Sequence, residues 1–240
     1  MKASRHVWVA GLAVALCALP AWGDWIPTDG YKMHYPQLPD PTGWDVCVTH
    51  WTVADDFRCS QSGPITDIHF WGSWKDDLIG QVTSIHLSLH SDVPDPDGTG
   101  PLISHPGDLL WSWTTDDFAV KPVDPPSWQG WLCPPDGAPL NNNHQKYFQY
   151  NIVNIPNPFP QVLDTIYWLD IAVTVDQGEF GWKTSTNHWN DGAAYWSPAT
   201  QEWLKVDCGF IDMAFVITPE PATLALLALG GLAILVRRRK

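Results

Sequence analysis

The feature that most restricts the fold is an alternation of apolar and polar side chains over short segments. In residues 82–90, Ile85, Leu87 and Leu89 alternate with polar residues, so one face of a strand is expected to be buried and the other wet. Residues 165–175 repeat this pattern with larger side chains. Pro, Gly and Asp turn signals separate further short segments of this kind, and no convincing amphipathic helix lies between them.

This pattern predicts an all-β domain, namely an antiparallel β-sandwich, of which the jelly roll is one arrangement. Three stretches rich in Pro and polar residues, 24–45, 94–106 and 125–139, are expected to be irregular. The predicted strands are residues 46–57, 65–74, 82–90, 109–113, 118–123, 145–153, 165–175, 180–184, 194–196, 203–206 and 211–217.

The first residues have the three parts of a signal peptide. Lys2 and Arg5 form a basic region, residues 7–19 form an apolar region, and small side chains that end at Gly23 suit a signal peptidase. We therefore expect residues 1–23 to be removed on export.

The last residues combine a proline motif, an apolar run over 224–236 and a terminal basic cluster. A helix over 222–236 spans roughly 22 Å, which is short against a hydrocarbon core of about 30 Å, although thinning of the bilayer or snorkelling of the arginine side chains lets a short helix span it. The positive-inside rule keeps the basic cluster in the cytoplasm. A buried core helix is the alternative, but the run has no polar face. The proline motif consists of Pro219, Glu220 and Pro221, and the basic cluster consists of Arg237, Arg238, Arg239 and Lys240.

Residues 219–240 thus resemble the PEP-CTERM sorting signal of Gram-negative bacteria. The resemblance implies that an exosortase recognises the proline motif and cuts near it. The precursor is then expected to be anchored in the inner membrane, and the product to reach the cell envelope or the extracellular matrix.

The remaining region, residues 24–218, is long enough for one domain with a real core. Of the 13 Lys and Arg residues and 26 Asp and Glu residues, six cations and one acid lie in the two ends, which leaves 7 basic and 25 acidic groups and a net charge near −18. Such a surface repels phosphate backbones and argues against nucleic-acid binding.

Several stretches of this region resemble an uncharacterised domain of unknown function found in exported bacterial proteins with the same tail. They include Ala-Asp-Asp-Phe at 54–57, Phe-Trp-Gly-Ser-Trp at 70–74, and residues 87–92, 106–111 and 180–191. The resemblance brings no known catalytic residue with it.

Four cysteines remain after processing, and an even number in an exported protein predicts disulfides. The short spacing between Cys47 and Cys59 favours that bridge, which leaves Cys133 with Cys208. Free buried thiols are the alternative.

A cation site is the second candidate. Asp92, Asp95 and Asp97 are closely spaced before Gly98, and carboxylates with a sharp turn suit calcium. The spacing does not match an EF-hand, so an ordinary acidic loop is the alternative.

The third candidate is a glycan contact through Trp128, Trp131 and Trp189, because exposed indoles stack on sugar faces, whereas buried ones fill a core. No nucleophile or hydrolase motif occurs, so we predict a non-catalytic structural or glycan-contacting module and assign no catalytic residue. The alternative is a glycoside hydrolase that uses Asp carboxylates from several strands. The Asp doublets at 55–56, 76–77 and 116–117 are expected mainly in turns and caps.

Overall fold

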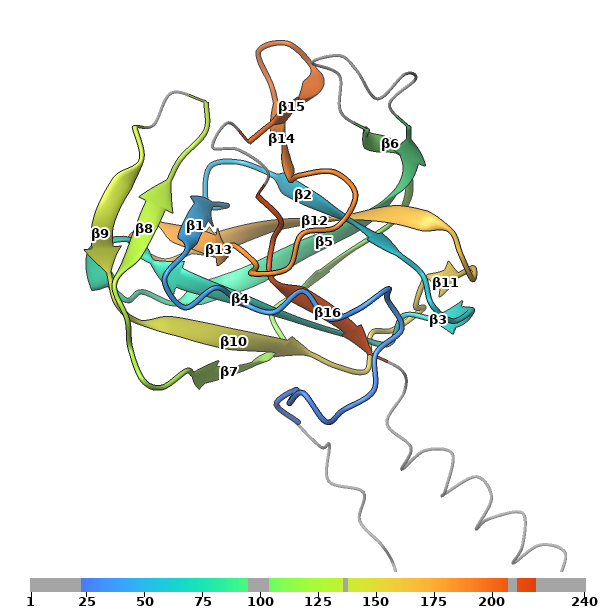
Figure 1. Cartoon of the computed structure of the whole chain (residues 1–240), viewed down its shortest axis with the longest axis horizontal. Coiled ribbons are helices and arrows are strands. Elements are labelled where there is room, and N and C mark those ends of the chain that lie inside the picture. The colour runs from blue at the N-terminus through green and yellow to red at the C-terminus, as the bar shows by residue number, and fades with distance from the viewer. Residues whose placement is uncertain (1–22, 95–103, 136–137, 207–210, 219–240) are drawn as a thin grey trace, which may run out of the picture.

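The computed structural model describes residues 23–94, 104–135, 138–206 and 211–218 (Figure 1). These residues form strands joined by loops and one short 3-10 turn, η1 (Lys75–Asp77). Across these ranges, no helix has the length and apolar character to cross a membrane. The predicted signal peptide, apart from Gly23, and the sorting tail lie outside the described residues.

Eight strands form the larger sheet, in the order β7-β10-β4-β13-β1-β8-β9, with β16 paired to β4 beside this path. Its pairs are antiparallel except for β1 and β8, which run parallel. The strands are β1 (Trp44–Cys47), β4 (Asp67–Trp74), β7 (Ala119–Pro122), β8 (Gln129–Leu132), β9 (Leu140–His144), β10 (Tyr147–Ile152), β13 (Phe180–Lys183) and β16 (Phe215–Thr218).

Six antiparallel strands form the second sheet, in the order β15-β14-β2-β12-β5-β6. A separate two-stranded ribbon pairs β3 (Gly63–Pro64) with β11 (Pro160–Gln161). The strands of the second sheet are β2 (Val53–Arg58), β5 (Val82–Val93), β6 (His105–Thr115), β12 (Ile166–Val175), β14 (Ala194–Ser197) and β15 (Glu202–Lys205).

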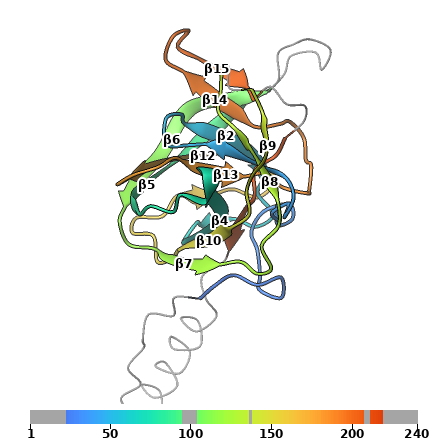
Figure 2. The ribbon, with the colours of Figure 1, turned by 90° about the vertical axis from the view of Figure 1, so that its left-hand side faces the viewer.

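The two large sheets share one hydrophobic core. Figures 1 and 2 show the arrangement of their strands from two sides. Phe57 on β2 reaches Phe215 on β16 of the other sheet, with ring centroids 5.9 Å apart. The side chains predicted to be apolar on β5, Ile85, Leu87 and Leu89, are all fully buried. The prediction of an all-β fold of antiparallel sheets is confirmed.

The outer face of β12 is also covered, which simple alternation does not predict. Trp168 on this face is fully buried in a small cluster with Ala54 and Ala194. The β14–β15 hairpin carries Trp203 over this cluster. Trp168 and Asp170 on this face are therefore excluded from water, whereas Thr174 near the end of β12 is exposed.

Two strand predictions were wrong. The segment expected as one strand over 46–57 is divided into β1 and β2, which belong to different sheets. The segment 125–139, expected to be irregular, contains β8. Its short apolar run pairs in parallel with β1, a partner far away in the sequence.

A fully buried charged triad joins three strands of the larger sheet. Lys183 on β13 donates to Oδ2 of Asp45 on β1 at 2.9 Å, and His144 Nε2 on β9 lies 3.0 Å from the same oxygen. None of the three side chains is exposed. Burial opposes ionisation of Asp45, but the charge of Lys183 and the hydrogen bond with His144 outweigh it, so the pKa of Asp45 is lowered.

Replacing Lys183 with Met should reduce the free energy of unfolding by about 3–5 kcal/mol, because Asp45 would keep a buried charge without its cation. Urea denaturation measures this loss. Lys121→Met is the control, since it removes only the partly exposed ion pair with Asp24 and should cost less than about 1 kcal/mol. Equal losses in the two variants would show that the triad is not a special source of stability.

Candidate functional site

A groove of about 540 Å³ crosses the end of the larger sheet near the start of the described chain. Trp71 on β4 and Pro122 on β7 line it from the sheet, and Trp25 and Pro39 line it from the N-terminal segment. The rings of Trp25 and Trp71 meet edge to face at 6.0 Å. Polar groups in its lining include Lys121, Asp124 and Gln149.

Hydrogen bonds hold the N-terminal wall of this groove against the sheet. The Gln149 side chain donates to the carbonyl of Trp25 at 2.9 Å. Lys121 pairs with Asp24 at 2.8 Å. An apolar lining with a few fixed polar groups is the usual composition of a small-molecule site.

The three tryptophans predicted to contact glycan lie in different environments. Trp128, four residues after Asp124 of the groove, is 54% exposed and is the one exposed tryptophan among the described residues. Trp189 is half-buried and stacks on His34 at 4.2 Å. Trp131 is only 1% exposed and packs in the larger sheet, so its ring faces are not free to stack on a sugar. The structure does not bring the three together as one flat face.

The Asp doublets do not share one environment either. Asp76 and Asp77 lie in η1, where Asp77 accepts the backbone N–H groups of Gln145 and Lys146, each at 3.0 Å. This doublet is a turn and cap, as predicted. Asp55 and Asp56, by contrast, lie within β2 and are fully buried.

The buried carboxyls of β2 form an acidic cluster with Asp212, and all three have raised pKa values. Burial is the largest cause in each case. It raises the pKa of Asp56 to about 8, assisted by the neighbouring charge of Asp191 and opposed by a hydrogen bond from Asn190. It raises the pKa of Asp212 to about 6, opposed by the backbone N–H of Trp189.

The acidic cluster should make the protein less stable as pH rises. Raised pKa values mean that the folded state holds protons which the unfolded state has already released above about pH 4. The cluster therefore contributes most below that pH, and the contribution is lost as pH rises through about 6 for Asp212 and about 8 for Asp56.

Asp56→Asn should flatten this decline and stabilise the protein at about pH 8, by an amount on the order of a few kcal/mol, because Asn mimics the protonated carboxyl. Urea denaturation between about pH 5 and about pH 8 measures it. Asp108→Asn, at an exposed position on β6, is the control. A native protein that gains stability over this range would show that the carboxyls are ionised and neutralised by a cation.

The predicted calcium ligands are only partly described. Asp92 lies on β5, and its Oδ1 accepts the indole N–H of Trp168 at 2.9 Å. Asp95 and Asp97 lie outside the described residues. Calcium binding by this loop stays a prediction.

Three of the predicted disulfide cysteines are described, and they are free thiols in the structure. Cys59 donates to the carbonyl of Gln61 at 3.2 Å, whereas the thiol of Cys47 hydrogen-bonds with Cys133. Cys208 lies outside the described residues. The predicted bridges stay a prediction, although the structure places Cys133, not Cys59, beside Cys47.

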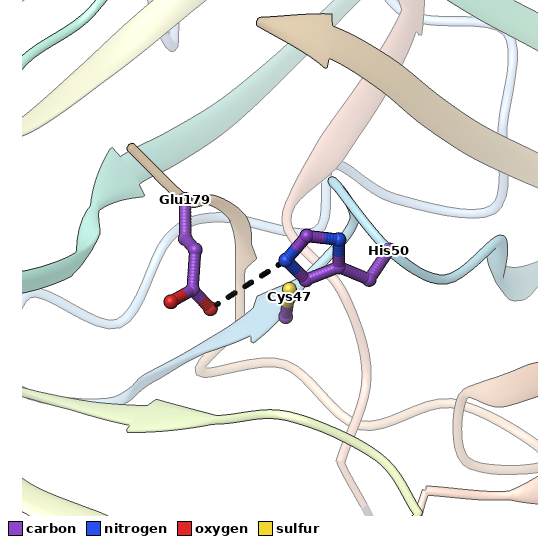
Figure 3. A group of neighbouring side chains, drawn as sticks. All are labelled: Cys47, His50 and Glu179. Carbon is purple, nitrogen blue, oxygen red and sulfur yellow. Dashed lines mark ion pairs between the residues drawn. The ribbon is translucent and has the colours of Figure 1, made fainter. Parts of the chain in front are cut away.

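Two further side chains join this cysteine pair, and the four residues Cys47, Cys133, His50 and Glu179 are called the thiol cluster below. Figure 3 shows the side chains of Cys47, His50 and Glu179 converging from separate parts of the backbone. One ligand atom from each of these three lies within 4.8 Å of the other two. His50 Nε2 and Glu179 Oε2 are 4.0 Å apart.

The register of the larger sheet creates the thiol cluster. Val46 and Leu132 are partners in the parallel pair β1–β8, so Cys47 and Cys133 follow at the next position of each strand. Glu179 directly precedes β13, which pairs with β1 on its other side. The sequence prediction missed His50 and Glu179, and only a knowledge of this strand order would have indicated them.

Comparison with known proteins identifies both parts of the chain by family. The model of a domain of unknown function, DUF7901, matches residues 33–218. The PEP-CTERM protein-sorting motif matches residues 218–240. No curated protein and no solved structure matches the chain.

Proposed function

The chain belongs to the DUF7901 family and ends in a PEP-CTERM motif, so it is an exported protein processed by an exosortase, and we propose that its domain is a non-catalytic module that contacts extracellular polysaccharide. The observation that carries the proposal is the exposure of Trp128, which follows the groove residue Asp124 by four positions in the chain. An exposed indole ring loses little entropy on binding and offers a flat apolar face to a sugar.

The surroundings of Trp128 support this contact. Ser127 donates to the carbonyl of Pro41, which ties the Trp128 loop to the chain segment that lines the groove through Pro39. The groove adds proline and tryptophan walls and the charged groups of Lys121 and Asp124. A polysaccharide chain lying over Trp128 would place a neighbouring sugar at the groove.

The placement of the carboxyls supports a non-catalytic role over the alternative of a glycoside hydrolase. A hydrolase of this kind needs two accessible carboxyls across the scissile bond. Asp55, Asp56 and Asp212 are at most 1% exposed. The groove contains a single carboxyl, Asp124, and a second cleft of about 590 Å³ contains only Asp116.

We also propose that residues 219–240 hold the precursor in the inner membrane before cleavage, with Arg237, Arg238 and Arg239 on the cytoplasmic side. Mass spectrometry of the mature protein from its host should then find a C-terminus near Pro221. A variant with Glu220 replaced by Ala should accumulate at full length in the membrane fraction. Mature native protein that still ends in Lys240 would refute exosortase processing.

Trp128→Ala should weaken retention by polysaccharide about tenfold or more, because loss of one well-placed aromatic contact commonly costs more than about 1 kcal/mol. Affinity electrophoresis in gels containing exopolysaccharide extracted from the producing bacterium measures retention, and a glycan array extends the search.

Leu109→Ala is the matched control, since Leu109 is 59% exposed but lies on β6 of the other sheet. It should be retained like the native protein. Native protein that is not retained by any glycan would leave a purely structural role. Release of reducing sugar that disappears on substitution of one carboxylate would replace the proposal with the hydrolase.

A further inference from the structure

We propose that the thiol cluster binds one Zn²⁺ ion as a closed structural site. Cys47, His50 and Glu179 offer ligand atoms within 4.8 Å of one another, and Cys133, which lies beside Cys47, would supply the fourth ligand. Two thiolates, one imidazole and one carboxylate are ligands of the kind that zinc takes in tetrahedral coordination. The ligands come from four places in the chain: the end of β1, the connection after it, the residue after β8 and the residue before β13. Such a set would join strands that are far apart in the sequence.

The spacing suits a small tetrahedral ion. With zinc-to-ligand distances of about 2.0–2.3 Å, neighbouring ligand atoms in a tetrahedron lie about 3.3–3.7 Å apart. His50 Nε2 and Glu179 Oε2 are 4.0 Å apart, so they need to approach by less than about 1 Å. His50 can make this movement, because its side chain is 57% exposed.

Three N–H groups donate to the two sulfurs, although in the metal-free protein the contact with Cys133 and burial raise the pKa of Cys47. The backbone N–H groups of Thr49 and His50 donate to the sulfur of Cys47. The indole N–H of Trp51 donates to the sulfur of Cys133. Hydrogen bonds from outer groups to ligand atoms orient the ligands and stabilise their charged forms.

The carboxylate of Glu179 is oriented in the same way. Lys75 donates to its Oε1 at 2.7 Å, which leaves Oε2 directed to His50. The backbone N–H of Lys75 also donates to the carbonyl of Glu179 at 3.0 Å. Glu179 is therefore fixed by two contacts, neither of which uses the oxygen that would bind zinc.

The charges of this arrangement balance. With zinc bound, the two sulfurs would be thiolates and, together with the Glu179 carboxylate, would carry three negative charges, against which the zinc ion and Lys75 supply three positive ones. A disulfide between Cys47 and Cys133 would satisfy the sulfurs alone. It would give no role to His50, to Glu179 or to the three N–H donors, so the surroundings favour a metal.

Metal analysis of the processed protein, purified from the envelope or extracellular fraction of cells grown with zinc, tests the proposal. We expect one zinc per chain after desalting. Exchange for Co²⁺ should give thiolate-to-cobalt charge-transfer absorption. Cys133→Ser should reduce this absorption by about half, and His50→Ala should retain it, while each variant lowers the affinity for zinc at least about tenfold.

Cys59→Ser is the matched control, because Cys59 bonds to Gln61 away from the cluster, and it should bind zinc like the native protein. His50 is exposed, so His50→Ala decides the question even where Cys133→Ser does not fold. An affinity for zinc that is unchanged in His50→Ala, or native protein purified without zinc, would overturn the proposal. Alkylation of unreduced protein that finds Cys47 and Cys133 joined in a disulfide would overturn it as well.

Discussion

The larger sheet depends on one electrostatic constraint, namely that the charge of Asp45 must be neutralised where no water reaches it. Lys183 and His144 both bind its Oδ2. These three residues lie on β1, β13 and β9, and the direct register pair of Asp45 is Lys183 itself. A shift of β13 by one residue would turn Lys183 to the opposite face and leave the buried carboxylate of Asp45 without its lysine, so the triad fixes the register.

That register determines where the chemistry of the larger sheet lies. β1 contacts β13 on one side and β8 on the other, so β1 carries both Asp45 of the triad and Cys47 of the thiol cluster. The groove is built at another part of the sheet, from β4 and β7. The second sheet holds a different kind of group, the buried acids Asp55 and Asp56 on β2.

The sequence predicted the fold class and most strands, because period-two alternation is a local signal. The strand prediction failed where the pairing partner of a strand lies far away in the sequence. β8 is only four residues long, and its partner β1 lies more than eighty residues earlier, so nothing local distinguishes β8 from a loop. Charged doublets were expected mainly in turns and caps, because they rarely occupy a fully buried strand, yet Asp55 and Asp56 lie buried within β2.

The candidate sites also divide into residues that a local sequence signal predicts and residues that only long-range strand pairing brings together. Exposure of Trp128 was predictable from its place in a Pro-rich connection, whereas Trp131, three residues later, is buried because it enters β8. Cysteine spacing indicated Cys59 as the partner of Cys47, but spacing measures distance along the chain only. The parallel register brings Cys133 there instead, and His50 and Glu179 follow because the loops after β1 and before β13 meet at the same end of the sheet. Site residues that converge through sheet order are therefore accessible only once that order is known.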